Sequence, residues 1–138
     1  MELSKRHKAY FKAAKVISEL SDFPRVSVGC VVVYKHKIIS SGYNSNKTNP
    51  TQKRLNIHRF NVDTPATIHA EVAALLPLIN RKDINFNDVS LYIYREYKNG
   101  NPALSKPCPS CLALIRQLCI KKLYYSGDNS YINEELIY

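Results

Sequence analysis

The sequence predicts a single α/β domain in which helices and strands alternate after an initial β-hairpin. Its 138 residues are about the length of one domain. Hydrophobic residues recur at helical spacing in some segments and form short β-branched runs in others, and the two kinds of segment alternate. Because neither a repeat nor a low-complexity tract marks a boundary, residues 1–138 are interpreted as one domain.

Composition excludes several classes of protein. Hydrophobic residues make up 45% of the chain and charged residues 22%, which is ordinary for a globular domain. These values exclude a largely disordered chain, a collagen-like repeat and a coiled coil. No apolar run approaches the roughly 18–20 residues that a membrane-spanning helix needs. We therefore expect no membrane association.

The first expected elements are a helix and a β-hairpin. Residues 4–20 carry apolar side chains three and four positions apart, which is typical of one buried helix face, and Ser4 is a suitable N-cap. The nearly continuous Val-rich run 26–34 predicts a buried strand. A polar turn at 35–37 leads to a second strand at 38–43, and strands joined this closely are antiparallel.

The middle of the chain predicts a long loop, a helix and a third strand. Residues 44–66 are polar and lack periodicity, and loops longer than about 12–15 residues are uncommon and often functional. A helical pattern begins at Thr67 or Ile68 and ends near Leu78. The apolar run 89–94 then predicts a strand.

A second loop, a short helix and a fourth strand follow. Residues 95–106 contain Gly and Pro and predict the loop, residues 109–119 the helix, and residues 120–125 the strand. The tail 128–138 predicts either a further strand or a short helix. Helical crossovers between the later strands imply that these strands are parallel, with right-handed connections.

The net charge of +9 is unevenly distributed. Residues 1–60 hold 12 Lys and Arg against 3 Asp and Glu, whereas residues 61–138 hold 8 of each sign. Such a basic region attracts anions such as a nucleotide phosphate, a nucleic acid or an acidic membrane. A well-solvated, lysine-rich surface helix accounts for the same charge equally well.

The four cysteines, Cys30, Cys108, Cys111 and Cys119, bear on the cellular environment. The basic N-terminal residues contain no continuous apolar segment of the kind a secretion signal has, so a reducing, cytoplasmic location is expected. Metal binding or burial is then expected rather than disulfides. Cys30 and Cys119 belong to no motif and are predicted core residues, whereas His7 is predicted to lie at the surface.

Two short motifs, each at the start of a predicted helix, carry the chemistry. One contains His69 and Glu71, and the other is the Cys-x-x-Cys pair of Cys108 and Cys111. A helix N-terminus favours the thiolate form of cysteine, and two thiolates with a neutral imidazole suit zinc. Three protein ligands leave one tetrahedral position for a water that zinc activates. Glu71 could take a proton from that water and deliver it to a leaving amine.

Taken alone, the Cys-x-x-Cys pair also fits a structural zinc site or a redox pair. Together, however, the two motifs resemble the H-x-E and P-C-x-x-C signature of the zinc-dependent cytidine and deoxycytidylate deaminase superfamily. The resemblance covers roughly residues 26–126. It implies a three-layer α/β/α cytidine-deaminase-like fold with a mixed five-stranded sheet, Zn²⁺ as cofactor, and a homo-oligomer.

The same resemblance implies a role for each matched residue. His69, Cys108 and Cys111 would be the zinc ligands, and Glu71 would be the proton carrier. Substrate contacts are implied for Asn44 with the sugar, the backbone N–H of Ala70 with the pyrimidine carbonyl, the backbone carbonyl of Lys106 with the amino group, and Arg25 with a phosphate. Asn44 could instead simply cap a turn.

The expected reaction is hydrolytic deamination of a small-molecule pyrimidine nucleotide, with dCMP converted to dUMP. One alternative is a deaminase of bases in single-stranded DNA or RNA, and another is an inactive zinc domain that binds nucleic acid or a protein partner. The run after Glu71 resembles that of riboflavin-pathway deaminases, but their cysteines are spaced more widely. The loop 95–106 is longer than in tRNA adenosine deaminases. Both this loop and the loop 44–66 are expected to border the pocket.

Overall fold

The computed structural model describes residues 4–58, 66–128 and 130–137. Its helices and strands are α1 (Lys5–Ser18), β1 (Val26–Tyr34), β2 (Lys37–Tyr43), α2 (Pro50–Leu55), α3 (Ala70–Leu75), β3 (Ser90–Tyr97), β4 (Pro102–Ala103), α4 (Pro109–Gln117), β5 (Lys122–Ser126) and β6 (Tyr131–Glu135). Short 3₁₀ turns follow at Asn56–His58, Leu76–Leu78 and Phe86–Asp88. None of the described helices combines the length and apolar character that crossing a bilayer requires.

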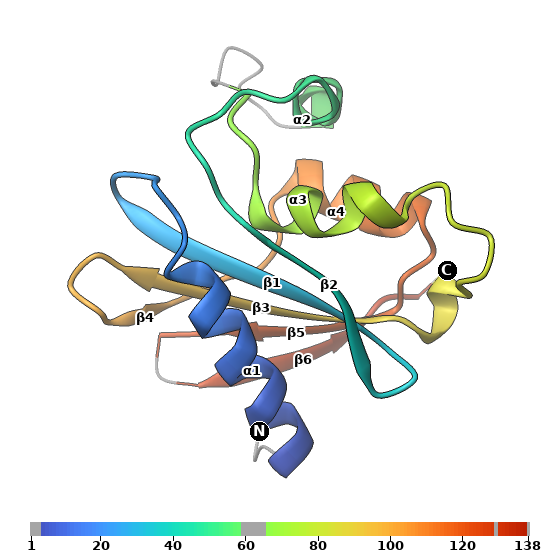
Figure 1. The fold of residues 1–138 in the computed structure, drawn as a ribbon, viewed down its shortest axis with the longest axis horizontal. Helices are drawn as coiled ribbons and strands as arrows, with labels where there is room; N and C mark the ends of the chain where they lie inside the picture. The colour runs from blue at the N-terminus through green and yellow to red at the C-terminus, as the bar shows by residue number, and fades with distance from the viewer. Residues whose placement is uncertain (1–3, 59–65, 129, 138) are drawn as a thin grey trace.

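The strands form one sheet in the order β2-β1-β3-β5-β6, and β4 pairs with β3 as a sixth strand. Helix α1 covers one face of this sheet, and α3 and α4 cover the other (Figure 1). The mixed sheet with helices on both faces confirms the predicted three-layer α/β fold. Strand β4 is an addition to the five-stranded sheet that the resemblance implies.

Strand directions follow the predicted connections. Strand β1 is antiparallel to both β2 and β3, so β2 and β3 point the same way, and β5 is parallel to β3. Helical connections join β2 to β3 and β3 to β5, as parallel strands require. The hairpin turns at Lys35 and His36, whose φ angles of 51° and 65° match the twist of antiparallel strands.

Two hydrophobic cores occupy the two faces of the sheet. In β1, Cys30 packs into the core beneath α3 and α4, whereas Val31 packs into the core beneath α1. The core beneath α1 is aromatic, and the rings of Tyr92 and Tyr124 stack there with centroids 4.5 Å apart. The functional motifs belong to the opposite face, because they begin α3 and α4.

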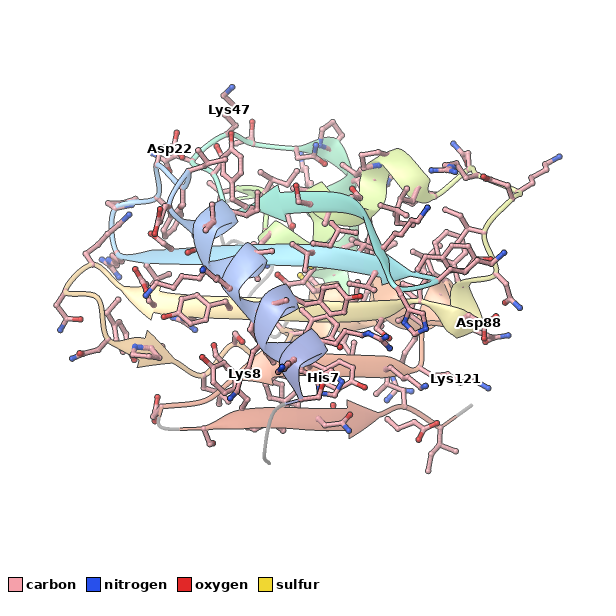
Figure 2. All side chains as sticks on the ribbon, turned by 60° about the horizontal axis from the view of Figure 1, so that its bottom comes forward. His7, Lys8, Asp22, Lys47, Asp88 and Lys121 are labelled. Carbon is pink, nitrogen blue, oxygen red and sulfur yellow. The ribbon has the colours of Figure 1, made fainter. Side chains whose placement is uncertain are left out.

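Helix α1 begins as predicted, since the Ser4 side chain accepts a hydrogen bond from the His7 N–H at 3.2 Å. The prediction that His7 lies at the surface is wrong in part. Its ring is half-buried against β5, with its centroid 4.7 Å from that of Tyr124 (Figure 2). The ring is partly buried because it packs against the aromatic side chains Tyr92 and Tyr124 of the sheet.

The long loop after β2 is partly helical, contrary to the prediction. Helix α2 begins after Asn49, whose side chain accepts hydrogen bonds from the N–H groups of Thr51 and Gln52. Pro50 occupies the first helical position, which it favours. Six residues are too few for hydrophobic periodicity to reveal a helix. Residues 59–65 of the predicted loop lie outside the described residues.

Other boundaries also differ from the prediction. The helix expected from Thr67 or Ile68 starts at Ala70, because Thr67 is extended and forms a β-bridge with Thr48. Strand β3 extends into the predicted loop 95–106, and the chain turns at Gly100, with φ of 90°, so that β4 pairs back onto β3.

The C-terminal tail and Cys30 agree with the predictions, whereas Cys119 does not. The tail forms the edge strand β6, antiparallel to β5, which is one of the two structures predicted there. Cys119, predicted in the core, is exposed instead, because α4 has ended and the residue adopts a left-handed φ of 63°. Cys30 is buried as predicted.

Candidate metal centre and cavity

Three predicted site residues meet where α3 and α4 begin. His69 is the N-cap of α3, Cys108 is the N-cap of α4, and Cys111 lies in the first turn of α4. Both N-cap residues are extended, with ψ of 156° at His69 and 167° at Cys108, and neither side chain caps its own helix. The two side chains are therefore available for contacts between the helices.

The potential ligand atoms lie at separations that suit a tetrahedral zinc ion. His69 Nδ1 is 3.3 Å from Cys111 Sγ and 3.5 Å from Cys108 Sγ, and all three atoms lie within 4.8 Å of one another. Zinc–nitrogen bonds of about 2.0–2.1 Å and zinc–sulfur bonds of about 2.3 Å place two tetrahedral ligand atoms about 3.6 Å apart. One imidazole and two thiolates are also a donor set that zinc prefers. The residues therefore fit the ion by distance and by chemistry.

The two thiols differ in acidity. A hydrogen bond from the Cys111 side chain lowers the pKa of Cys108 to about 3, and His69 contributes to this lowering. The same hydrogen bond, together with burial, raises the pKa of Cys111 above its usual value. Cys108 is therefore the first of the pair to be a thiolate, and a bound cation favours deprotonation of Cys111 as well.

A cavity of about 330 Å³ lies beside this cluster, with His69, Cys108 and Glu71 in its wall. Its volume is within the range of about 300–1,000 Å³ that small-ligand pockets occupy. Glu71 is only 6% exposed, and its burial raises the pKa of its carboxyl group. A buried carboxyl group with a raised pKa keeps its proton to higher pH than a solvated one, which suits it to proton transfer.

Asn44 lies in the cavity wall but also has a structural role. Its Oδ1 accepts a hydrogen bond from the Val28 N–H at 2.9 Å, and its Nδ2 donates to the Val26 carbonyl at 3.1 Å. These bonds fix the chain just after β2 against β1. The alternative of a turn cap therefore does not describe its contacts.

Of the other predicted substrate contacts, Lys106 and Ala70 lie at or beside the cavity and Arg25 does not. Lys106 lines the cavity, and its amino group also forms an ion pair with Glu134 at 3.7 Å. Ala70 is buried as the first residue of α3, between two residues that line the cavity. Arg25 is exposed in the turn before β1 and is not among the lining residues.

Arg95 is a cavity residue that sequence reasoning missed. It lies in β3, its Nη1 donates to the Leu104 carbonyl at 3.4 Å, and its buried Nε has no hydrogen-bond partner among the described residues. An unsatisfied, buried guanidinium N–H is uncommon and suggests an absent acceptor. The one sequence feature that could have indicated Arg95 is its position directly after the apolar run of a predicted strand.

No Lys or Arg side chain from the described part of residues 1–60 lines the cavity. The basic side chains that line the cavity, Arg95 and Lys106, come from the second part of the chain, where the charges balance. Helix α1, which carries several lysines, covers the opposite face of the sheet from α3 and α4 (Figure 1). The charge of residues 1–60 therefore does not indicate a phosphate contact in this cavity.

Comparison with known proteins finds two longer relatives with similar sequence. A probable deoxycytidylate deaminase of Caenorhabditis elegans is 29% identical over 128 residues, covering 88% of this chain and 57% of that protein. The tRNA-specific adenosine deaminase subunit tad2 of Schizosaccharomyces pombe is 28% identical over 126 residues, covering 90% of this chain and 26% of that protein. This chain therefore spans only about half of the first relative and a quarter of the second.

Structural and family comparisons agree with these relatives. The crystal structure of dCMP deaminase from the cyanophage S-TIM5, in apo form, has a TM-score of 0.63 and 26% identity, covering 90% of this chain and 84% of that one. Residues 4–127 match the family described as the cytidine and deoxycytidylate deaminase zinc-binding region. The family's ion is zinc, and His69, Cys108 and Cys111 are positioned to hold it. Because the match spans most of the sequence, the chain belongs to the cytidine and deoxycytidylate deaminase family.

Proposed function

We propose that this chain is a zinc-dependent deaminase that converts a cytosine nucleotide, with dCMP as the first candidate, to the corresponding uracil nucleotide and ammonia. The observation that carries the proposal is the buried Glu71 beside the His69, Cys108 and Cys111 cluster in one cavity wall. Membership of the family and the 26% identity to a phage dCMP deaminase support the same reaction class.

In this proposal His69, Cys108 and Cys111 would hold zinc, which would supply a water of lowered pKa near neutral pH. Glu71 would take up a proton and deliver protons to the ring and to the leaving amino group. The bond from ring carbon C4 to oxygen forms, and the bond from C4 to the amino nitrogen breaks. One water is consumed and one ammonia is released, so no oxidant or reductant is needed.

Three backbone or amide groups are proposed to hold the nucleoside. As the first residue of α3, Ala70 has an N–H without an intrahelical acceptor, and this group donates to the pyrimidine carbonyl. The Lys106 carbonyl, two residues before Cys108, accepts from the amino group. The Asn44 amide uses one Nδ2 hydrogen on β1, which leaves its second for the sugar.

A phosphate on the substrate is proposed to contact Arg95 rather than Arg25. Arg95 lines the cavity and has a buried N–H without a partner among the described residues, whereas Arg25 is exposed outside the cavity. A guanidinium group also matches phosphate geometry, because it offers two parallel donors.

Arg95→Met is expected to lower kcat/KM for dCMP by about 10- to 100-fold relative to deoxycytidine, because a hydrogen bond to a charged group contributes about 1.5–3 kcal/mol. Both substrates should be measured with the wild type, Arg95→Met and Arg25→Met. We expect Arg25→Met to keep the wild-type ratio of the two substrates. An unchanged ratio in Arg95→Met would contradict the phosphate contact.

The substrate class is tested by ammonia release from a panel of dCMP, CMP, their nucleosides and single-stranded oligonucleotides. We expect dCMP to be used most efficiently. Faster turnover of an oligonucleotide would favour the second candidate, a nucleic-acid base deaminase, which the net charge of +9 and the likeness to tad2 support. Oligonucleotide binding would then weaken steeply with salt. Protein that holds zinc but deaminates none of these compounds contradicts the proposed function and favours an inactive zinc domain.

Two expectations about the whole protein stay predictions. Neither the cytoplasmic location nor the homo-oligomer follows from the arrangement of these residues. Size measurement of the purified zinc-loaded protein would test self-association.

A further inference from the structure

A chain of buried polar side chains links α2 to the starts of both α3 and α4. Gln52 is fully buried, and its Oε1 accepts a hydrogen bond from the backbone N–H of His69 at 3.1 Å. Its Nε2 donates to Asn56 Oδ1 at 3.0 Å, and Ser110 Oγ donates to the same oxygen at 3.0 Å. Asn56 and Ser110 are 3% and 0% exposed. The contacts thus run from the start of α3, through Gln52 of α2 and Asn56 just after it, to the start of α4.

The ends of this chain coincide with the candidate ligands. His69 receives the contact on its own backbone, and Ser110 lies in the sequence between Cys108 and Cys111. Neither N-cap side chain is held by its own helix, so the orientation of these segments must come from elsewhere. Because the Gln52 amide uses its oxygen in one direction and its nitrogen in the other, its orientation is defined by both partners.

Hydrophobic packing alone does not call for polar side chains at these positions. Burying an amide or hydroxyl group carries a desolvation cost, and an apolar core of the same volume avoids it. A fully satisfied polar network instead restrains its members to one arrangement. The arrangement found here restrains the His69 peptide, whose rotation would break a buried hydrogen bond and redirect the imidazole.

We propose that Gln52, Asn56 and Ser110 are positioning residues that keep His69 Nδ1 and the two sulfurs at zinc-binding distance. They act through the ligands and do not contact the substrate. This inference rests on the zinc site of the proposed function. It assigns the segment Pro50–Leu55, which sequence reasoning treated as loop, to the support of the metal centre.

The main test is Gln52→Met, which keeps the approximate side-chain volume and removes both amide groups. We expect its zinc dissociation constant, measured by competition with a chelator, to rise about 10- to 100-fold, as is typical when the outer partner of a metal ligand is removed. We also expect the visible absorption bands of the cobalt-substituted protein to shift. Gln52→Glu keeps an acceptor for the His69 N–H but loses the donor to Asn56 Oδ1, so its zinc affinity should lie between those of the wild type and Gln52→Met.

The matched control is Ser18→Ala. Ser18 is also fully buried and donates one hydrogen bond, to the Lys15 carbonyl at 2.6 Å, but it lies in α1 on the opposite face of the sheet. We expect this variant to lower the melting temperature without changing the zinc dissociation constant or the cobalt spectrum.

A Gln52→Met protein with wild-type zinc affinity and cobalt spectrum, whatever its melting temperature, would overturn the proposal. If this variant does not fold, Ser110→Ala, which removes a single donor, is measured in the same way, and unchanged values for it overturn the proposal as well. Both readouts need no substrate. Wild-type protein that binds zinc but deaminates nothing therefore defeats only the proposed function, whereas wild-type protein that binds no zinc defeats both.

Discussion

Glu71→Gln is expected to lower kcat for dCMP by about 10²- to 10⁴-fold, which is the usual contribution of a positioned general acid and base. Glutamine keeps the shape of the side chain but cannot accept and release a proton. The zinc content of the purified protein should be unchanged, because Glu71 is outside the His69, Cys108 and Cys111 cluster. Steady-state kinetics and metal analysis of the same preparation measure both quantities.

The stability of Glu71→Gln distinguishes loss of the proton carrier from misfolding as the cause of a lower kcat. Burial raises the pKa of Glu71, so at pH values above that pKa its charged form disfavours the folded state. A neutral glutamine removes this penalty, and Glu71→Gln should therefore melt no lower than the wild type near neutral pH. Glu96→Gln is a suitable control, because it makes the same chemical replacement away from the cavity. Glu96 accepts a hydrogen bond from the Tyr94 hydroxyl group on the other face of the sheet. Wild-type turnover in Glu71→Gln would refute the proton-carrier role, and loss of zinc would indicate a ligand instead.

Gly42→Ala is expected to destabilise the fold by about 3 kcal/mol, at the upper end of the usual cost of overpacking. A Cβ atom at Gly42 would meet the backbone nitrogen of Ala74 and would lie 2.6 Å from the carbonyl oxygen of Ala70. Both atoms belong to the backbone of α3, so rotation of a side chain cannot relieve the overlap. Helix α3 must move away from β2, and it carries His69 and Glu71 at its start. Chemical denaturation should show the loss of stability, and chelator competition should show weaker zinc binding.

Gly29→Ala provides the matched comparison. A Cβ atom there would meet the backbone carbonyl of Ala14 and would lie 2.6 Å from the backbone nitrogen of Ser18, so α1 would be displaced instead. We expect a similar loss of stability, but the folded fraction should bind zinc with wild-type affinity. Equal weakening of zinc binding by both substitutions would show that the site responds to general stability rather than to the position of α3.

The chemistry of the candidate site could be located from the sequence because it depends on residue types at short spacing. His69 and Glu71 are two positions apart, and Cys108 and Cys111 are three apart, so each pair occupies one helix start. Hydrophobic patterning also predicted helices α1, α3 and α4, the hairpin and the parallel crossovers, since each of these buries an apolar face. In the structure His69 Nδ1 lies 3.3 Å from Cys111 Sγ, a contact across 42 positions that the zinc donor set and the resemblance both implied.

The surroundings of the site could not be predicted in the same way, because they depend on tertiary contacts of polar residues. Gln52 contacts His69 across 17 positions, and Ser110 contacts Asn56 across 54. A polar residue in a polar segment gives no periodic signal that it will be buried. Arg95 enters the cavity wall because β3 extends beyond its apolar run, and local propensity does not determine where a strand ends.

The placement of charge shows the same limitation. The basic first part of the chain suggested an anion partner, yet the basic residues in the described cavity wall are Arg95 and Lys106. Net charge is a property of the whole surface, and only the fold decides which face carries it.

The division of the interior by the sheet has a consequence for how substitutions combine. Side chains beneath α1 and side chains beneath α3 belong to separate clusters with no member in common. Changes in unfolding free energy from substitutions in the two clusters should therefore be additive, as they are for sites without shared partners. Stabilising replacements among the aromatic residues under α1 can offset costly changes near the metal, so selection or engineering can alter the chemistry on one side while repairing the fold from the other.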